Sequence, residues 1–180
     1  GNPCGEIPGV DDNVIFDNSS FSSYFPQIIL NGPVEISSLN FHSKFNPVIV
    51  GNNSSLTIQK DFNATEKFEI QLGWNAAVNF INTSNSFGSI NSFGVKINSH
   101  INLSGNWELN NHLLAGFDND LTLKSGTIKT NGFTLFGDKI SANESEVKVD
   151  FSNSFIYCFS EIDLSSTTNI GSAADFRITD

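Results

Sequence analysis

The segment from Leu121 to Ile140 reads LTLKSGTIKTNGFTLFGDKI and constrains the fold more than any other part of the chain. Apolar Leu121 and Leu123 alternate with polar residues, Gly126 turns the chain, and Asn131-Gly132 turns it again. Alternation with a period of two is typical of half-buried strands. Such short strand-and-corner units bury their inward faces only by stacking on one another. The segment therefore predicts one unit of a stack of β-coils.

The same pattern of short alternating strands and Asn-, Ser- or Gly-rich corners runs through the chain. Corresponding strands recur roughly every 20 to 25 residues, as expected of a solenoid coil, so about seven coils would use the sequence. We predict an all-β, right-handed parallel β-helix (β-solenoid) that forms a single domain over residues 1–180. The alternative is an antiparallel β-sandwich, against which stands the scarcity of two-residue hairpin turns: Asn131-Gly132 is the one good case.

Composition and charge narrow the possible partners. The net charge is -10, from 19 Asp and Glu against 9 Lys and Arg, which disfavours binding to nucleic acid or to an anionic membrane surface. Apolar runs are short, so we expect no membrane insertion and no signal peptide, and we interpret Gly1 as the start of a mature or excised fragment. Residues 1–31 are rich in turn residues and are expected to form an N-terminal cap segment.

A motif near the N-terminus resembles a known family. Residues 4–21 read CGEIPGVDDNVIFDNSSF, which is similar to the motif that opens β-helical modules of large repetitive surface proteins of Bacteroidetes, the secreted or gliding-type adhesins. The stretches 105–113 (GNWELNNHL) and 121–135 look like the coils that follow in those proteins. The resemblance implies display on the outer cell surface, an adhesive or structural role, and neighbouring modules in a longer chain. It carries over no catalytic residues.

Asp118 and Asp120 are the strongest acidic candidates for a site. Parallel β-helix enzymes that cleave polysaccharides place carboxylates on neighbouring coils, so this pair would supply the catalytic carboxylates if the protein were a polysaccharide lyase or glycoside hydrolase. The competing interpretation is a solvated turn between Phe117 and Leu121. A lyase would also need Lys or Arg for its anionic substrate, and Arg177 is the single arginine.

Calcium is a second possibility for the acidic groups. Asp11-Asp12-Asn13 and Asp118-Asn119-Asp120 offer clustered oxygen ligands, although neither fits an EF-hand loop or a calcium-binding β-roll repeat. His42, His100 and His112 lack the spacing of a metal site, and we expect them to be exposed or hydrogen-bonded at strand edges. No other cofactor is expected.

The aromatic residues divide between the core and possible binding surfaces. Phe supplies 17 of the 180 residues, an unusual number that predicts a core filled by stacked rings. The phenylalanines expected to fill this core are Phe62, Phe68, Phe80, Phe133 and Phe151. Trp74 and Trp107 are candidates for carbohydrate binding, because an exposed indole on a flat sheet can stack on a sugar. Both lie in phase with apolar neighbours, which favours burial.

Cys4 and Cys158 are too far apart in sequence to form a local redox or metal motif. They either form a disulfide across a long loop or are two unrelated thiols, with Cys158 buried among aromatic residues.

The sequence therefore predicts a non-enzymatic structural or adhesive module of a secreted or cell-surface protein. It would act as a rigid spacer and could bind carbohydrate or an abiotic or cellular surface. The alternatives are a polysaccharide-active β-helix enzyme and a self-assembling segment with exposed apolar ends.

Overall fold

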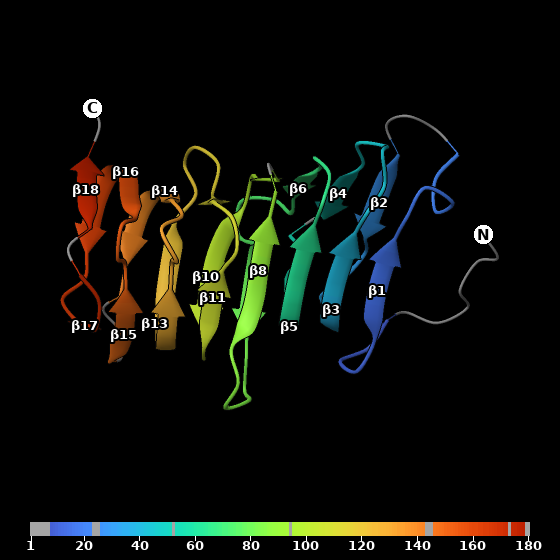
Figure 1. Cartoon of the computed structure of the whole chain (residues 1–180). Helices are drawn as coiled ribbons and strands as arrows, with labels where there is room; N and C mark the ends of the chain where they lie inside the picture. The colour runs from blue at the N-terminus through green and yellow to red at the C-terminus, as the bar shows by residue number, and fades with distance from the viewer. Residues whose placement is uncertain are drawn as a thin grey trace.

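The computed structural model describes residues 8–22, 26–51, 53–93, 95–142, 146–172 and 174–178. All the regular secondary structure in these ranges consists of β-strands. Accordingly, the described residues contain no helix that is long and apolar enough to cross a bilayer. The strands stack side by side into an elongated body with β1 (Asn13–Phe16) and β18 (Asp175–Ile178) at opposite ends (Figure 1).

The strands form three faces, and several long strands bend from one face to the next. The first face contains the C-terminal parts of three long strands, β3 (Val34–Phe41), β5 (Leu56–Ala64) and β13 (Leu121–Lys129). It also contains five whole strands: β1, β8 (Gly88–Ser92), β11 (Trp107–Leu109), β15 (Val147–Asp150) and β17 (Thr167–Asn169). The second contains the starts of β3, β5 and β13, with β7 (Ala77–Ile81), β10 (His100–Ser104) and the ends of β14 (Leu135–Ser141) and β16 (Phe155–Asp163).

The third face contains β2 (Gln27–Leu30), β4 (Val48–Gly51), β6 (Glu69–Gln71), β9 (Lys96–Ile97), β12 (Leu113–Leu114), the starts of β14 and β16, and β18. Pairing joins 14 strands into one sheet, and β2, β4, β6 and β9 into a second. A single bridge between Ile97 and Ala115 links β9 to the coil that contains β12.

All strand pairs are parallel, and the chain completes about seven turns. The predicted β-solenoid is therefore confirmed and the antiparallel sandwich is wrong. One column of paired, inward-facing residues on the second face marks the length of each coil. Its members are 22, 22, 23, 20, 19 and 22 residues apart: Val34, Leu56, Val78, Ile101, Leu121, Ile140 and Ile162.

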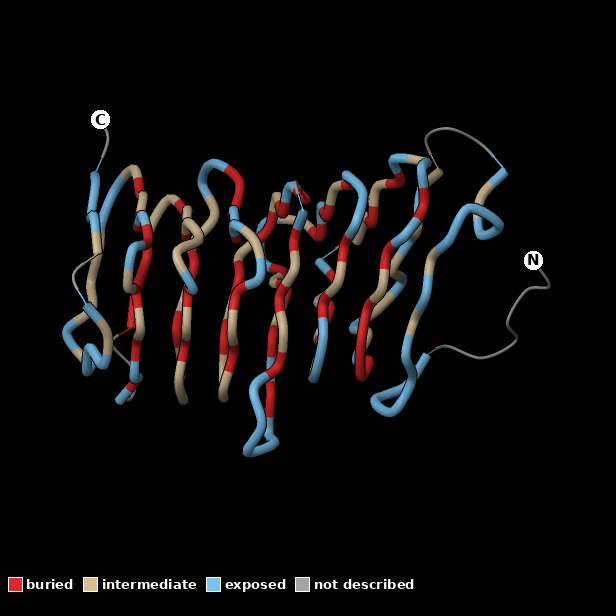
Figure 2. The backbone as a smooth tube through the Cα atoms, in the orientation of Figure 1, coloured by how far each residue is buried: buried red, intermediate tan, exposed pale blue. Residues whose placement is uncertain are grey.

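Inward-facing side chains fill the space between the three faces. Buried positions alternate with more exposed ones along many of the strands, such as β7 and β10, and the backbone coloured by burial shows this alternation (Figure 2). Aromatic rings form a continuous file through several coils, with neighbouring centroids between 4.4 and 6.2 Å apart. The members of this file are Phe16, Phe41, Phe68, Phe62, Phe80 and Trp107. Four of the five phenylalanines predicted for the core are buried. Phe133 is only half-buried, because it lies in the corner between β13 and β14, where its ring contacts that of His112.

Glycines allow the corner between the second and first faces to stack tightly. Gly105 and Gly126 occupy equivalent positions on successive coils and have φ angles of +88° and +86°. A Cβ on Gly126 would lie 2.2 Å from the carbonyl oxygen of Gly105, so this corner requires glycine for both space and backbone conformation. The turn predicted at Gly126 is therefore confirmed as a bend inside β13.

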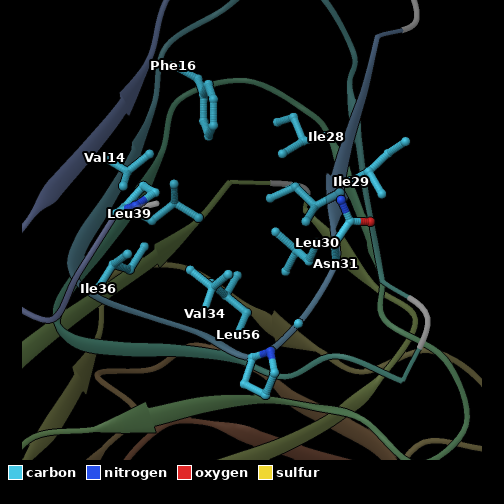
Figure 3. Close-up of a pocket in the computed structure, with 14 residues that line it drawn as sticks. Val14, Phe16, Ile28, Ile29, Leu30, Asn31, Val34, Ile36, Leu39 and Leu56 are labelled. Carbon is cyan, nitrogen blue, oxygen red and sulfur yellow. The ribbon is translucent and has the colours of Figure 1, made fainter. Parts of the chain in front are cut away.

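The described residues at the N-terminal end of the stack form an apolar surface. Within the predicted cap segment 1–31, β1 and β2 form part of the first coil, while residues 1–7 lie outside the described chain. A cavity of about 490 Å³ opens at this end, lined by side chains such as Val14, Phe16 and Ile28, and no lining residue is charged (Figure 3). At the other end, inward positions on the first face become polar, since Thr167 and Asn169 pair with Val147 and Val149.

Candidate functional site

Trp74 is the most exposed large apolar side chain of the described residues, with 83% of its surface accessible. The alternation that buries Phe68, Ile70 and Leu72 stops at Gly73, which has a φ of +100°. This left-handed conformation begins a turn after β6, closed by a hydrogen bond from the Ala76 N–H to the Gly73 carbonyl, and it directs the next side chain out of the core. The predicted burial of Trp74 is therefore wrong, and its indole stands on the corner between the third and second faces.

Trp107 has the opposite environment. Its side chain is fully buried, its ring lies 5.5 Å from that of Phe80, and its Nε1–H donates a hydrogen bond to the Ser104 carbonyl at 2.8 Å. The predicted burial of Trp107 is confirmed. An indole enclosed in this way presents no face to a sugar. Trp107 is therefore a core residue, and its prediction as a carbohydrate-binding residue is wrong.

Trp74 borders a polar hollow on the second-face side, which we name the His100 depression. Its volume is about 360 Å³, and its lining residues are Trp74, Asn75, Ala76, Ala77, His100, Asn102, Asp120 and Thr122. Strand register brings these residues together from three coils: His100 pairs with Ala77, and Thr122 pairs with Asn102. Amide, hydroxyl, imidazole and carboxylate groups therefore gather beside the exposed indole.

A second hollow lies against Trp74 on the third-face side, and we name it the Phe117 depression. Its volume is about 380 Å³, and its lining residues are Gln71, Gly73, Trp74, Asn98, Phe117, Asp118 and Asn119. Phe117 is 68% exposed and stacks on Phe159 with the ring centroids 4.9 Å apart. The exposed rings of Trp74 and Phe117 therefore both border this hollow.

Hydrogen bonds fix several of these polar groups. His100 Nδ1 accepts from the Asp120 N–H at 3.0 Å, so a neutral His100 carries its proton on Nε2. Asn102 Nδ2 donates to Asn79 Oδ1 at 2.9 Å, and Asn119 Nδ2 donates to the Phe117 carbonyl at 2.7 Å. The site is therefore held in shape before any ligand binds.

Histidines bond in the same way elsewhere in the stack. Nδ1 of His112 accepts from the Thr134 N–H at 3.0 Å, and Nδ1 of His42 lies 3.1 Å from Thr65 Oγ1. Each of the three histidines thus bonds to a residue of the following coil, which confirms the expected role at strand edges.

The two predicted carboxylates line different hollows. Asp118 lines the Phe117 depression and Asp120 lines the His100 depression, with Trp74 bordering both. Asp118 has a φ of +60°, as expected for a turn residue, which agrees with the turn interpretation. No lysine or arginine is found among the described residues that line either hollow.

Metal-binding geometry is not assembled at the predicted positions. In the part of the chain that the structure describes, no group of three or more His, Cys, Asp or Glu side chains could hold a metal ion. Asp12 instead closes a turn, because its Oδ2 accepts from the Gly9 N–H at 2.7 Å. The structure therefore gives the calcium prediction for Asp11, Asp12, Asp118 and Asp120 no support.

Cys158 is buried in the third-face column between Gly137 and Ile178, and burial raises the pKa of its thiol. Cys4 lies outside the described residues, so the predicted pairing of the two cysteines stays a prediction.

The chain matches no protein-family model, no curated protein and no solved structure. The site therefore rests on its own geometry. Sequence reasoning missed Phe117, His100, Asn102 and Thr122 as parts of one surface. A signal for Phe117 was present: Gly116-Phe117-Asp118 repeats the pattern Gly73-Trp74-Asn75 at the same corner, two coils later.

Proposed function

We propose that this chain is a non-enzymatic, rigid β-solenoid module that binds neutral carbohydrate at Trp74. The observation that carries the proposal is an indole 83% exposed between two hollows lined by amide, hydroxyl and carboxylate groups. An exposed tryptophan at a wet polar site combines a large apolar face with nearby hydrogen-bonding groups, which suits ligands that have both kinds of surface.

Sugars have this dual character. The C–H groups on one side of a pyranose ring pack on the indole, while its hydroxyls reach the surrounding polar groups. Asn102, Asp120 and Thr122 supply acceptors, and Thr122 and the Nε2–H of a neutral His100 supply donors. Because Asp118 and Asp120 are acidic and no Lys or Arg lines the hollows, an anionic polysaccharide would be repelled.

The rigid scaffold supports binding. Trp74, His100 and Phe117 stand on corners of successive coils whose backbones are joined by parallel hydrogen-bonded ladders. A surface that needs little ordering loses little conformational entropy when a ligand binds. The lack of Lys and Arg among the described lining residues favours binding of a neutral sugar over cleavage of an anionic polysaccharide.

We further propose that the module is part of a secreted or cell-surface protein with neighbouring coils. The apolar end that the described residues present, lined by Val14, Phe16 and Ile28, supports contact with another module, because each coil of a solenoid packs its inward-facing side chains against the next coil. The resemblance of residues 4–21 to surface adhesins supports display outside the cell.

Affinity electrophoresis of the 180-residue chain in gels containing β-1,3-glucan, β-1,4-glucan, mannan or polygalacturonate tests carbohydrate binding. We expect retardation by at least one neutral polysaccharide, no retardation by polygalacturonate, and loss of retardation in Trp74→Ala. Phe93→Ala is the matched control, because Phe93 is also an exposed aromatic residue, 48% accessible, and lines neither hollow. Equal retardation of the wild type and Trp74→Ala, or none in any gel, would refute the proposal.

A further inference from the structure

The two depressions meet at Trp74, which is the one residue of the described chain that lines both. The His100 depression is built on the second face, from the beginnings of β7 and β10 and from Thr122 in β13. The Phe117 depression is built where the third face ends, from Gln71 at the end of β6 and from Asn98, which follows β9. A path from one hollow to the other therefore crosses the corner over the indole.

Each part of this path offers a different contact. The Phe117 depression supplies a second exposed ring together with the side chains of Gln71 and Asn98. Trp74 supplies the apolar crest, and the His100 depression supplies mainly polar groups. Trp74 is 83% and Phe117 is 68% accessible, so these contacts lie on an open surface. An open path of this kind accepts the interior of a chain and does not require a chain end.

From this geometry, and resting on the proposed carbohydrate binding, we infer that the ligand is an internal stretch of a curved, neutral polysaccharide. At least three consecutive sugar units occupy the Phe117 depression, the Trp74 crest and the His100 depression. Trp74 projects from the corner between the second and third faces, with one hollow on the second-face side and one on the third-face side. A straight ribbon such as a β-1,4-glucan touches such a corner at one unit, whereas a β-1,3-glucan curves and follows it into both hollows.

Isothermal titration calorimetry with β-1,3-glucan oligosaccharides of two, three and six units, and with the matching β-1,4-linked series, tests the inference. We expect the affinity for the β-1,3 series to rise by at least about tenfold from the disaccharide to the hexasaccharide, because linked subsites act together. The β-1,4 hexasaccharide should bind at least about fivefold more weakly than the β-1,3 hexasaccharide, since it loses the contacts in one hollow.

Variants at the two ends of the path separate the subsites. Phe117→Ala removes the ring of one hollow, and Thr122→Val removes a hydroxyl from the other at nearly constant shape. Each should reduce affinity for the β-1,3 hexasaccharide by about three- to tenfold, and Trp74→Ala should cause a larger loss because it removes the ring that borders both hollows. Phe93→Ala should leave this affinity unchanged, and circular dichroism checks that every variant folds.

Other outcomes separate the inference from the function on which it rests. Equal affinity across chain lengths, equal affinity for the two linkages, or no effect of Phe117→Ala would overturn the inference while leaving carbohydrate binding intact. Absence of binding to every polysaccharide in the gels would overturn the proposed function and the inference with it.

Discussion

Trp107 packs directly against Gly88, the residue with which it pairs on the preceding coil. A Cβ at position 88 would lie 2.5 Å from Cζ3 of the indole and 2.5 Å from the Lys60 carbonyl oxygen. The largest buried side chain of the core therefore occupies space that only glycine leaves open.

Replacing Gly88 with alanine should strongly destabilise the fold. The added methyl group would push against both a backbone oxygen and a ring that is itself enclosed, so we expect a loss of about 2–4 kcal/mol in the free energy of unfolding. Urea denaturation measures this change. Gly32→Ala is the control, because nothing lies within 4 Å of a Cβ at that position. A loss for Gly88→Ala as small as that of the control would contradict the packing described here.

The two tryptophans should respond differently to truncation. Trp107→Ala empties a fully buried site and should cost about 3–5 kcal/mol of unfolding free energy. Trp74→Ala removes a side chain that is 83% exposed and should change stability by less than about 0.5 kcal/mol. Thermal unfolding of both variants beside the wild type tests this contrast. Equal destabilisation by the two substitutions would show that Trp74 is part of the core.

Acid should weaken the turn that follows β15. Hydrogen bonds from the Ser152 hydroxyl and N–H hold the pKa of Asp150 below its ordinary value of 3.8. The unfolded chain therefore binds this proton at a higher pH than the folded chain. The stabilisation is present above a pH of about 3.8 and is lost as the pH falls through the lower pKa of the folded state.

Urea midpoints of the wild type and Asp150→Asn from about pH 6 down to about pH 2.5 test this linkage. Asparagine keeps the shape of the side chain but does not titrate, so the two curves should converge as the pH falls. A constant difference between the curves at every pH would contradict the assigned role of the carboxylate.

Removal of calcium should leave the fold unchanged. The described residues bring together no group of three acidic or imidazole ligands, and Asp118 and Asp120 line separate hollows. We expect the same melting temperature in EDTA and in millimolar calcium, measured by differential scanning calorimetry. A rise with calcium that disappears in Asp120→Asn would restore the predicted metal site.

Much of the architecture is predictable because it depends on local pattern. Alternation through Leu121 and Leu123 and a bend at Gly126 indicate strand and corner, and coils of similar length follow from their spacing. The direction of Trp74 is not predictable in this way. It depends on the left-handed backbone of Gly73, which breaks an alternation that otherwise places Trp74 inside.

The candidate site depends on register between coils. Coil lengths vary between 19 and 23 residues, so sequence spacing alone does not show that Thr122 stands beside Asn102 or that His100 pairs with Ala77. Phe133 shows that the burial of a core residue is likewise not predictable from the sequence pattern alone. Its apolar character predicts burial, yet its position at a corner leaves it half-buried against His112.

Intrinsic fluorescence reports carbohydrate binding at Trp74, because the chain has only two tryptophans, one exposed and one buried. The polysaccharide that retards the wild type in gels is titrated into the wild type and into Trp74→Phe, which retains an aromatic ring at the crest. We expect a blue shift and reduced acrylamide quenching in the wild type, and neither change in Trp74→Phe. An unchanged wild-type spectrum at saturating ligand, or the same shift in Trp74→Phe, would place the binding site away from Trp74.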